Sequence, residues 1–175
     1  MFLPGILKTI RNLFMFAMVA LSLTACGGGG DNSPVTVTTT RQFQSLQISL
    51  TTRRVARLGE TVPITFTINN VGAGTITVML GGAPDAISQV KQGNVEIWNW
   101  ATGKAYPAVL PSPQSIAPNE TRTYDLSWDQ KNNSGDQVLS GSYMINAWFN
   151  TASVNGNTVS PQTDLAAEPI TVAIQ

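Results

Sequence analysis

Apolar and polar side chains alternate through most of this chain, and this alternation constrains the fold more than any other feature. Apolar residues recur at every second position in the runs 46–50, 62–68, 76–80, 95–97, 124–128, 143–149 and 170–174. A period of two is typical of strands with one buried face, because successive side chains of a strand point to opposite faces. No window carries the 3.6-residue period of an amphipathic helix. The pattern therefore predicts an all-β protein.

Turn-forming residues separate these runs and indicate how the strands are arranged. Dipeptides such as Thr102-Gly103, Ser134-Gly135 and Asn155-Gly156 supply or tolerate positive φ. Short strands spaced in this way favour one immunoglobulin-like antiparallel β-sandwich of about seven to eight strands, which we place at residues 41–175. Three prolines fall within residues 109–118, so this segment is expected to be a crossing loop or an edge strand.

The first 25 residues have the pattern of a bacterial export signal. Lys8 and Arg11 precede an apolar stretch at residues 13–23, which is shorter than the roughly 20 apolar residues that span a bilayer. The stretch ends in Leu23-Thr24-Ala25-Cys26, which resembles the lipobox of bacterial lipoproteins. We therefore predict a signal peptide at residues 1–25 and lipid attachment, including a palmitate-type acyl chain, at Cys26.

Cys26 is the chain's only cysteine, and lipidation accounts for it. Each buried CH₂ of an acyl chain contributes about 0.8 kcal/mol to membrane binding, so two or three chains anchor a protein stably. Residues 26–40 are rich in Gly and Thr and are predicted to be a flexible tether. Gly27 stands where Asp, in known enteric lipoproteins, signals retention in the inner membrane. We expect an exported protein anchored in the cell envelope, in the outer membrane if the organism is Gram-negative.

The composition argues against several function classes. The chain has no histidine, its cysteine is assigned to the lipid, and no paired-carboxylate or phosphate-binding pattern is evident. We therefore predict that it is not an enzyme and needs no cofactor or metal. Without the two basic residues of the leader, eight basic residues face ten acidic ones, which argues against a nucleic-acid partner. Residues 129–136 superficially resemble a calcium loop but carry Lys131 at a ligand position, so we interpret them as a polar turn.

Several short motifs occur in a recognisable order along the chain. Residues 98–106 read W-x-W-x-x-G-K-x-Y, and residues 116–120 read I-x-P-N-E. Residues 127–138 read S-W-D-x-x-x-x-x-G-x-x-V, and residues 141–143 read G-x-Y. Together with the strand end at residues 64–70, these blocks resemble the W-x-W-x-x-G-K-x-F, L-x-P-G-E, T-W-D-x-x-x-x-x-G-x-x-V, G-x-Y and V-x-N motifs of the intracellular proteinase inhibitor (BsuPI) family. The resemblance covers about residues 62–149.

The resemblance implies an immunoglobulin-like sandwich and inhibition of a serine protease. This sequence departs from the family pattern at three points. Asn119 replaces the turn glycine, a mild change because Asn tolerates the left-handed conformation. Residues 150–168 form a long connection before the last strand. The leader also directs this chain out of the cytoplasm, where the founding member's protease resides. No reactive-site residue of the family transfers to this sequence.

Trp98 and Trp100 lie on one face of a predicted strand. If Val95 and Ile97 face the core, the two Trp side chains face outward and form a partner-binding patch. If the register shifts at a bulge, they belong to the core, which the usual burial of Trp favours. Trp128 and Tyr143 are predicted to be core residues.

Two functions remain open at this level. The first is a lipid-anchored, non-catalytic protein-binding module, whose most specific version is protease inhibition through residues 107–115 or 150–168. The alternative is a structural accessory lipoprotein of an envelope assembly with no inhibitory activity.

Overall fold

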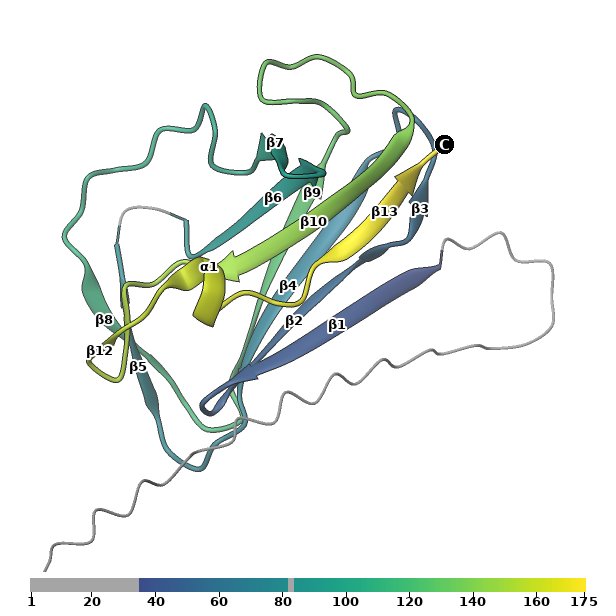
Figure 1. Cartoon of the computed structure of the whole chain (residues 1–175). Helices are drawn as coiled ribbons and strands as arrows, with labels where there is room; N and C mark the ends of the chain where they lie inside the picture. The colour runs from purple at the N-terminus through teal and green to yellow at the C-terminus, as the bar shows by residue number, and fades with distance from the viewer. Residues whose placement is uncertain (1–34, 82–83) are drawn as a thin grey trace, which may run out of the picture.

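The computed structural model describes residues 35–175 except 82 and 83, and these residues form an immunoglobulin-like β-sandwich (Figure 1). Hydrogen-bonded strands make three sheets, which we call sheet A (β1-β2-β4-β9), sheet B (β3-β13-β10-β6-β7) and sheet C (β12-β11-β5-β8). Neighbouring strands are antiparallel, apart from the short parallel pair of β3 and β13. The predicted fold class is therefore confirmed.

Sheet A follows the alternation of the sequence closely. Its strands are β1 (Thr36–Phe43), β2 (Leu46–Arg53), β4 (Val62–Asn70) and β9 (Thr121–Trp128). Every second side chain of β4 is buried. Phe66 of β4 lies opposite Leu50 on one side and Tyr124 on the other, so apolar side chains of three strands form a row on the inner face. Such cross-strand rows stabilise a sheet.

Sheet B contains two strands that the alternation did not reveal, at residues 55–56 and 86–92. Its strands are β3 (Val55–Ala56), β6 (Ala86–Gln92), β7 (Val95–Asn99), β10 (Gly141–Phe149) and β13 (Ile170–Ile174). In β6 the buried positions are Ala86, Ser88 and Val90, and the polar Ser88 interrupts the apolar pattern. The Ser88 hydroxyl donates a hydrogen bond to the Asn146 carbonyl oxygen at 3.0 Å, so this buried polar group has a partner.

The core contains buried side chains of all three sheets, and Trp128 and Tyr143 belong to it, as predicted. Trp128 from β9 meets the Tyr143 ring from β10, with ring centroids 5.3 Å apart. Trp128 Nε1 donates a hydrogen bond to the Lys131 carbonyl at 2.9 Å, and the Tyr143 hydroxyl donates one to the Leu139 carbonyl at 2.7 Å. Both aromatic side chains are thus buried with their polar atoms paired.

Sheet C joins the chain's middle to its C-terminal third. It contains β5 (Ile76–Leu80), β8 (Ser112–Ile116), β11 (Ser153–Val154) and β12 (Asn157–Thr158). In Figure 1 it lies at the left, away from the C-terminus. β8 is an edge strand that places Pro113 opposite Met79. The interpretation of residues 109–118 as a crossing loop or an edge strand is therefore confirmed, because proline is tolerated at an edge.

Strand β1 corrects the predicted boundary between tether and domain. The tether was expected to run through residue 40, yet residues 36–40 pair with β2. Threonine is β-branched and favours strands. Thr38 and Thr40 also exchange side-chain hydrogen bonds with Thr51 and Ser49, at 2.8 and 3.0 Å. The signal peptide and residues 26–34 of the predicted tether, with Cys26, lie outside the described residues.

Residues 150–169, which we call the cap segment, form a folded unit. The segment contains β11, β12 and the short helix α1 (Pro161–Asp164). It buries Val154, Val159, Leu165 and Ala167. Backbone hydrogen bonds hold it against β10, from Phe149 N to Leu165 O at 3.0 Å and from Ala167 N to Ala147 O at 3.1 Å. Within the described part of the chain, no helix has the length and apolarity that a membrane span requires.

Candidate functional site

The turn at residues 129–138 is organised by its own side chains. Asn132 Oδ1 accepts hydrogen bonds from the backbone N–H groups of Ser134 and Asp136, both at 2.9 Å. Lys131 and Gln137 form an isolated antiparallel bridge. This is the geometry of a polar turn. Among the residues that the structure describes, no group of three or more His, Cys, Asp or Glu side chains is placed to hold a metal ion.

Gln130 connects this turn to the turn after β3, and sequence reasoning missed it. Its side chain is buried and its backbone is left-handed, with φ of 59°. Its Nε2 donates hydrogen bonds to the carbonyls of Arg57 and Glu60 at 2.7 and 2.6 Å, and its Oε1 accepts one from Gly59 N at 2.9 Å. The three contacts replace the water that a buried amide would otherwise need, so Gln130 has a structural role.

Trp98 and Trp100 are both half-buried, so they are neither the exposed patch nor the full core residues that the sequence analysis considered. A register shift in the pairing of β6 with β7 places Trp98 opposite the buried Val90. Trp98 is partly buried and packs against the core, and the Trp100 ring meets it edge-on at 6.2 Å. The Lys104 ammonium stands 2.8 Å from the Trp100 ring centroid, and desolvation lowers the pKa of Lys104. The two rings therefore support the start of the following loop.

Asn133 closes the outer edge of β7. Its backbone N–H donates to the Ile97 carbonyl, and its Oδ1 accepts from Asn99 N, both at 2.9 Å. Its Nδ2 donates to Glu96 at 3.1 Å. A polar cleft of about 210 Å³ lies here, with Trp98 at one wall. Asn133 uses its polar atoms to cover the strand edge, and Asp129 and Lys131 of the same turn also line the cleft.

The most exposed apolar segment of the described chain is the connection between β7 and β8. We call residues 104–111 the apolar loop, with the sequence Lys-Ala-Tyr-Pro-Ala-Val-Leu-Pro. All of its residues are exposed, and Leu110 is 90 % exposed and Val109 55 %. Large apolar side chains that gather in solvent mark interaction sites on soluble proteins.

Both ends of the apolar loop are held by the fold. At its start, Lys104 N donates to the Ala101 carbonyl at 3.3 Å beside the Trp100 contact. Within it, Val109 N donates to the Pro107 carbonyl at 3.0 Å. At its end, Pro111 packs near Gly81, where an added Cβ would stand 3.6 Å from Pro111 Cγ. Ser112 then pairs with Leu80 in sheet C.

Arg122 holds β8, the strand that follows the apolar loop, through a hydrogen bond, and is itself held by an ion pair with Glu120. Arg122 Nη2 donates to the Ser115 carbonyl at 2.6 Å, and Arg122 Nε pairs with Glu120 Oε1 at 2.8 Å. Glu120 also accepts a hydrogen bond from Ala117 N at 2.7 Å. The Ala117 N–H and the Arg122 guanidinium lower the pKa of Glu120, so its carboxylate stays charged in this role.

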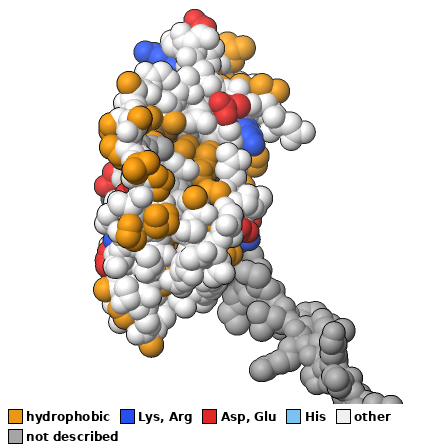
Figure 2. Space-filling view, turned by 90° about the vertical axis from the view of Figure 1, so that its left-hand side faces the viewer, with side chains coloured by type: hydrophobic (Ala, Val, Ile, Leu, Met, Phe, Trp, Pro, Cys, Tyr) orange, Lys and Arg blue, Asp and Glu red, His pale blue; other side chains and the backbone are white. Residues whose placement is uncertain are grey.

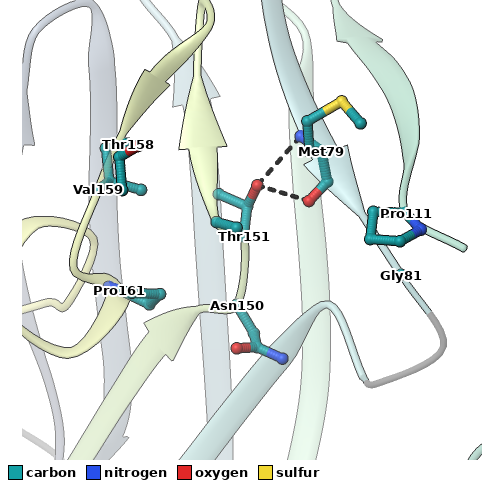
Figure 3. Close-up of a pocket in the computed structure, with 9 residues that line it drawn as sticks. Met79, Gly81, Pro111, Asn150, Thr151, Thr158, Val159 and Pro161 are labelled. Carbon is teal, nitrogen blue, oxygen red and sulfur yellow. Dashed lines mark hydrogen bonds between the residues drawn. The ribbon is translucent and has the colours of Figure 1, made fainter.

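A shallow groove runs beside the C-terminal end of the apolar loop (Figure 3). It has a volume of about 350 Å³ and lies between Met79, Pro111, Val159 and Pro161. Thr151 fixes the groove's floor. Its hydroxyl donates to the Met79 carbonyl at 2.8 Å and accepts from Met79 N at 3.1 Å. The groove therefore joins the loop to the cap segment on one surface.

Figure 2 shows this side of the molecule. Hydrophobic side chains gather over the middle of the face, and Lys, Arg, Asp and Glu lie mostly toward its edges. Figure 1 places the β7–β8 connection, β8 and β12 on the same side. An apolar centre with a polar rim is the usual anatomy of a protein interface.

The two loops that the sequence analysis proposed for partner binding differ in structure. The proposed loop at residues 107–115 divides into exposed loop and edge strand. The second proposed loop, residues 150–168, lies entirely within the folded cap segment. Leu110 and Val109 were not singled out from the sequence. The signal that could have found them is a short apolar run between prolines that breaks the alternation.

Three comparisons place the chain among known proteins. A family model described as BsuPI, intracellular proteinase inhibitor, matches residues 49–154. The match extends from β2 to β11, includes the whole apolar loop and leaves out most of the cap segment. The search of curated proteins gave no match.

The solved structures that resemble the chain are distant. A CARDB domain from Pyrococcus furiosus, determined in solution, shares 18% identity, with a TM-score of 0.40 and coverage of 76% of this chain and 96% of that domain. A crystal structure of the CARDB domain with di-metal ions, also from Pyrococcus furiosus, shares 18% identity, with a TM-score of 0.41 and coverage of 77% and 90%. A β-glucosidase from Listeria innocua in complex with glucose shares 10% identity, with a TM-score of 0.40 and coverage of 83% and 17%.

Proposed function

This chain belongs to the intracellular proteinase inhibitor (BsuPI) family, and on that premise we propose that it is a non-catalytic protein-binding module that inhibits a serine-type protease. The observation that carries the proposal is the apolar loop. Its eight residues are all exposed, and its ends are fixed by the Trp100 contact and by sheet C. A loop that is ordered before binding loses little conformational entropy in the complex, which favours tight inhibition.

The surface around the loop adds contact area. A specific interface needs about 800 Å² from each partner, more than eight residues supply. The groove lined by Met79, Val159 and Pro161 adjoins the loop and extends the apolar area. We propose that the protease contacts the loop and this groove together, while the polar rim remains in water.

We further propose that the module acts in the cell envelope, held by lipid at Cys26. The lipobox-like segment before Cys26 and the absence of other cysteines support this location. The partner protease would then lie outside the cytoplasm. Cys26→Ser should abolish incorporation of labelled fatty acid and release the chain from the membrane fraction. Fatty-acid labelling that persists in Cys26→Ser would contradict the anchor.

Inhibition is tested by titration. The chain, expressed in full and purified in mild detergent, is added to subtilisin and to chymotrypsin, and residual peptide hydrolysis is measured. We expect a stoichiometric loss of activity with the inhibitor at nanomolar to low micromolar concentration. No inhibition at micromolar excess, with the chain intact afterwards, would remove the inhibitor function and leave the structural accessory role as the better account.

A further inference from the structure

We propose that Leu110 is the side chain that enters the primary specificity (S1) pocket of the inhibited protease, and that Pro111 protects the bond after it from hydrolysis. This inference rests on the proposed inhibitory function and assigns its contact residue and its protease class. A protease that cleaves after a large apolar residue is the partner that fits.

Leu110 stands out among the exposed apolar side chains of the described residues. It is 90 % exposed, against 55 % for Val109 and 37 % for Tyr106 in the same loop. Transfer of one leucine side chain from water into an apolar pocket strengthens binding by about tenfold to a hundredfold. Its removal costs the fold little, because it contacts almost nothing within the chain. Leu110 is therefore available to a partner without any rearrangement of the core.

The position before a proline suits an inhibitor better than a substrate. In acylation, the protease serine oxygen bonds to the carbonyl carbon of the residue in S1, the C–N bond breaks, and the departing nitrogen takes a proton from the catalytic histidine. At Leu110 the departing nitrogen would belong to Pro111. Its ring carbon replaces the amide hydrogen and crowds the preceding residue, which disfavours the geometry that this step needs.

The fold also holds the residues after this bond. Pro111 packs near Gly81, and Ser112 is paired with Leu80. A protease would therefore meet a substrate-like leucine whose following segment cannot move away easily. This arrangement predicts binding in the manner of a substrate with very slow turnover.

The pocket chemistry predicts which proteases respond. Chymotrypsin has an apolar S1 pocket that accepts leucine, whereas the S1 pocket of trypsin carries an aspartate and requires Lys or Arg. The wild-type chain should inhibit chymotrypsin-like or subtilisin-like enzymes and should not inhibit trypsin. An uncharged leucine leaves the trypsin aspartate buried without a partner, and this accounts for the discrimination.

The decisive variant is Leu110→Arg, with Leu139→Arg as its matched control. Leu139 is 79 % exposed and lies outside the apolar loop, just before β10. In the full chain, Leu110→Arg should weaken inhibition of chymotrypsin by about a hundredfold or more and create inhibition of trypsin. Leu139→Arg should change neither. Unaltered inhibition of chymotrypsin by Leu110→Arg would overturn the assignment while leaving the inhibitor function in place. A wild-type chain that inhibits no protease would overturn both.

Pro111→Ala tests the second half of the proposal. The variant should bind chymotrypsin at first and then be cut after Leu110. Hydrolysis adds one water, so that Leu110 gains a carboxylate and residue 111 gains an amine. Mass spectrometry should locate this cut, and inhibition should decay over the same period. A Pro111→Ala chain that stays intact and inhibitory for as long as the wild type would show that Pro111 does not protect the bond.

Discussion

The apolar loop and the cap segment are both long connections that leave sheet B, yet they place their apolar side chains in opposite environments. Leu110 in the loop is 90 % exposed, whereas Leu165 in the cap segment is fully buried. Both segments line the groove, the loop through Pro111 and the cap segment through Val159 and Pro161. One connection completes the core, and the other presents apolar surface to a partner.

The difference shows that apolar content alone does not predict the role of a connection. The cap segment forms backbone hydrogen bonds with β5 and β10, so its side chains are drawn over the end of the sandwich. The apolar loop contains two prolines, Pro107 and Pro111, which have no backbone N–H to pair with a sheet. The cap segment is therefore part of the fold because its backbone pairs with the sheets, whereas the apolar loop lacks such pairing and exposes its side chains.

The largest effect that tests this comparison is expected for Leu165→Ala. The substitution removes a fully buried side chain and leaves a cavity beneath the cap segment. We expect the free energy of unfolding to fall by about 2–5 kcal/mol. Urea denaturation followed by Trp fluorescence measures the change. A loss below 0.5 kcal/mol would mean that the cap segment does not belong to the core.

Thr151→Val should give a somewhat smaller loss. Valine keeps the shape of threonine but leaves both backbone groups of Met79 without the Thr151 hydroxyl. Unpaired buried polar groups cost about 1–3 kcal/mol, and urea midpoints should fall accordingly. Thr158→Val, at an exposed residue of the same groove, is the control and should leave the midpoint unchanged.

Removal of residues 35–40 should lower the stability of the domain moderately, because contacts of strand β1 with β2 and with the cap segment are lost. A fragment of residues 41–175 lacks the Thr38–Thr51 and Thr40–Ser49 pairs, together worth about 0.4–2 kcal/mol. It also lacks the hydrogen bond from Thr39 to the Glu168 carbonyl. Thermal melts should place the 41–175 fragment below a 35–175 fragment. Equal melting temperatures would mean that residues 35–40 add nothing to the domain and belong to the tether, as first expected from the sequence.

Leu110→Ala should have the smallest effect on stability. An exposed side chain of this kind contributes within about 0.5 kcal/mol to folding. The same variant should lose inhibition of chymotrypsin, so that binding and stability separate at this residue. A clear drop in the urea midpoint would indicate that the loop packs on the domain in solution and does not await a partner.

Much of the sandwich could be predicted from its alternation. Strands β4, β5, β9, β10 and β13 lie where apolar residues recur at every second position, because burial of one face imposes that period. β6 was missed because Ser88 is buried through a hydrogen bond to Asn146, which no periodicity reveals. The start of β1 was missed because its threonines resemble a polar tether in composition.

The candidate site was less predictable because it depends on tertiary pairing. The register shift between β6 and β7 decides how Trp98 and Trp100 sit, and sequence patterns do not specify it. The prolines of residues 107–115 indicated a loop or an edge strand, but the exposure of the loop depends on where β8 pairs with β5. Gln130 could not be recognised, since its partners at residues 57–60 are distant in sequence.

Hydrogen–deuterium exchange of the wild-type chain, alone and with catalytically inactive chymotrypsin, tests the central claim most directly. In the free chain, the amides of Ala105, Tyr106, Ala108 and Leu110, which donate no hydrogen bond, should exchange fast, and those of the cap segment that are bonded to β10 should be protected. Addition of the protease should slow exchange in residues 104–111 and leave the buried amides near Leu165 unchanged. Protection that appears only in the cap segment, or nowhere at saturating protease, would contradict the account of the apolar loop as the inhibitory surface.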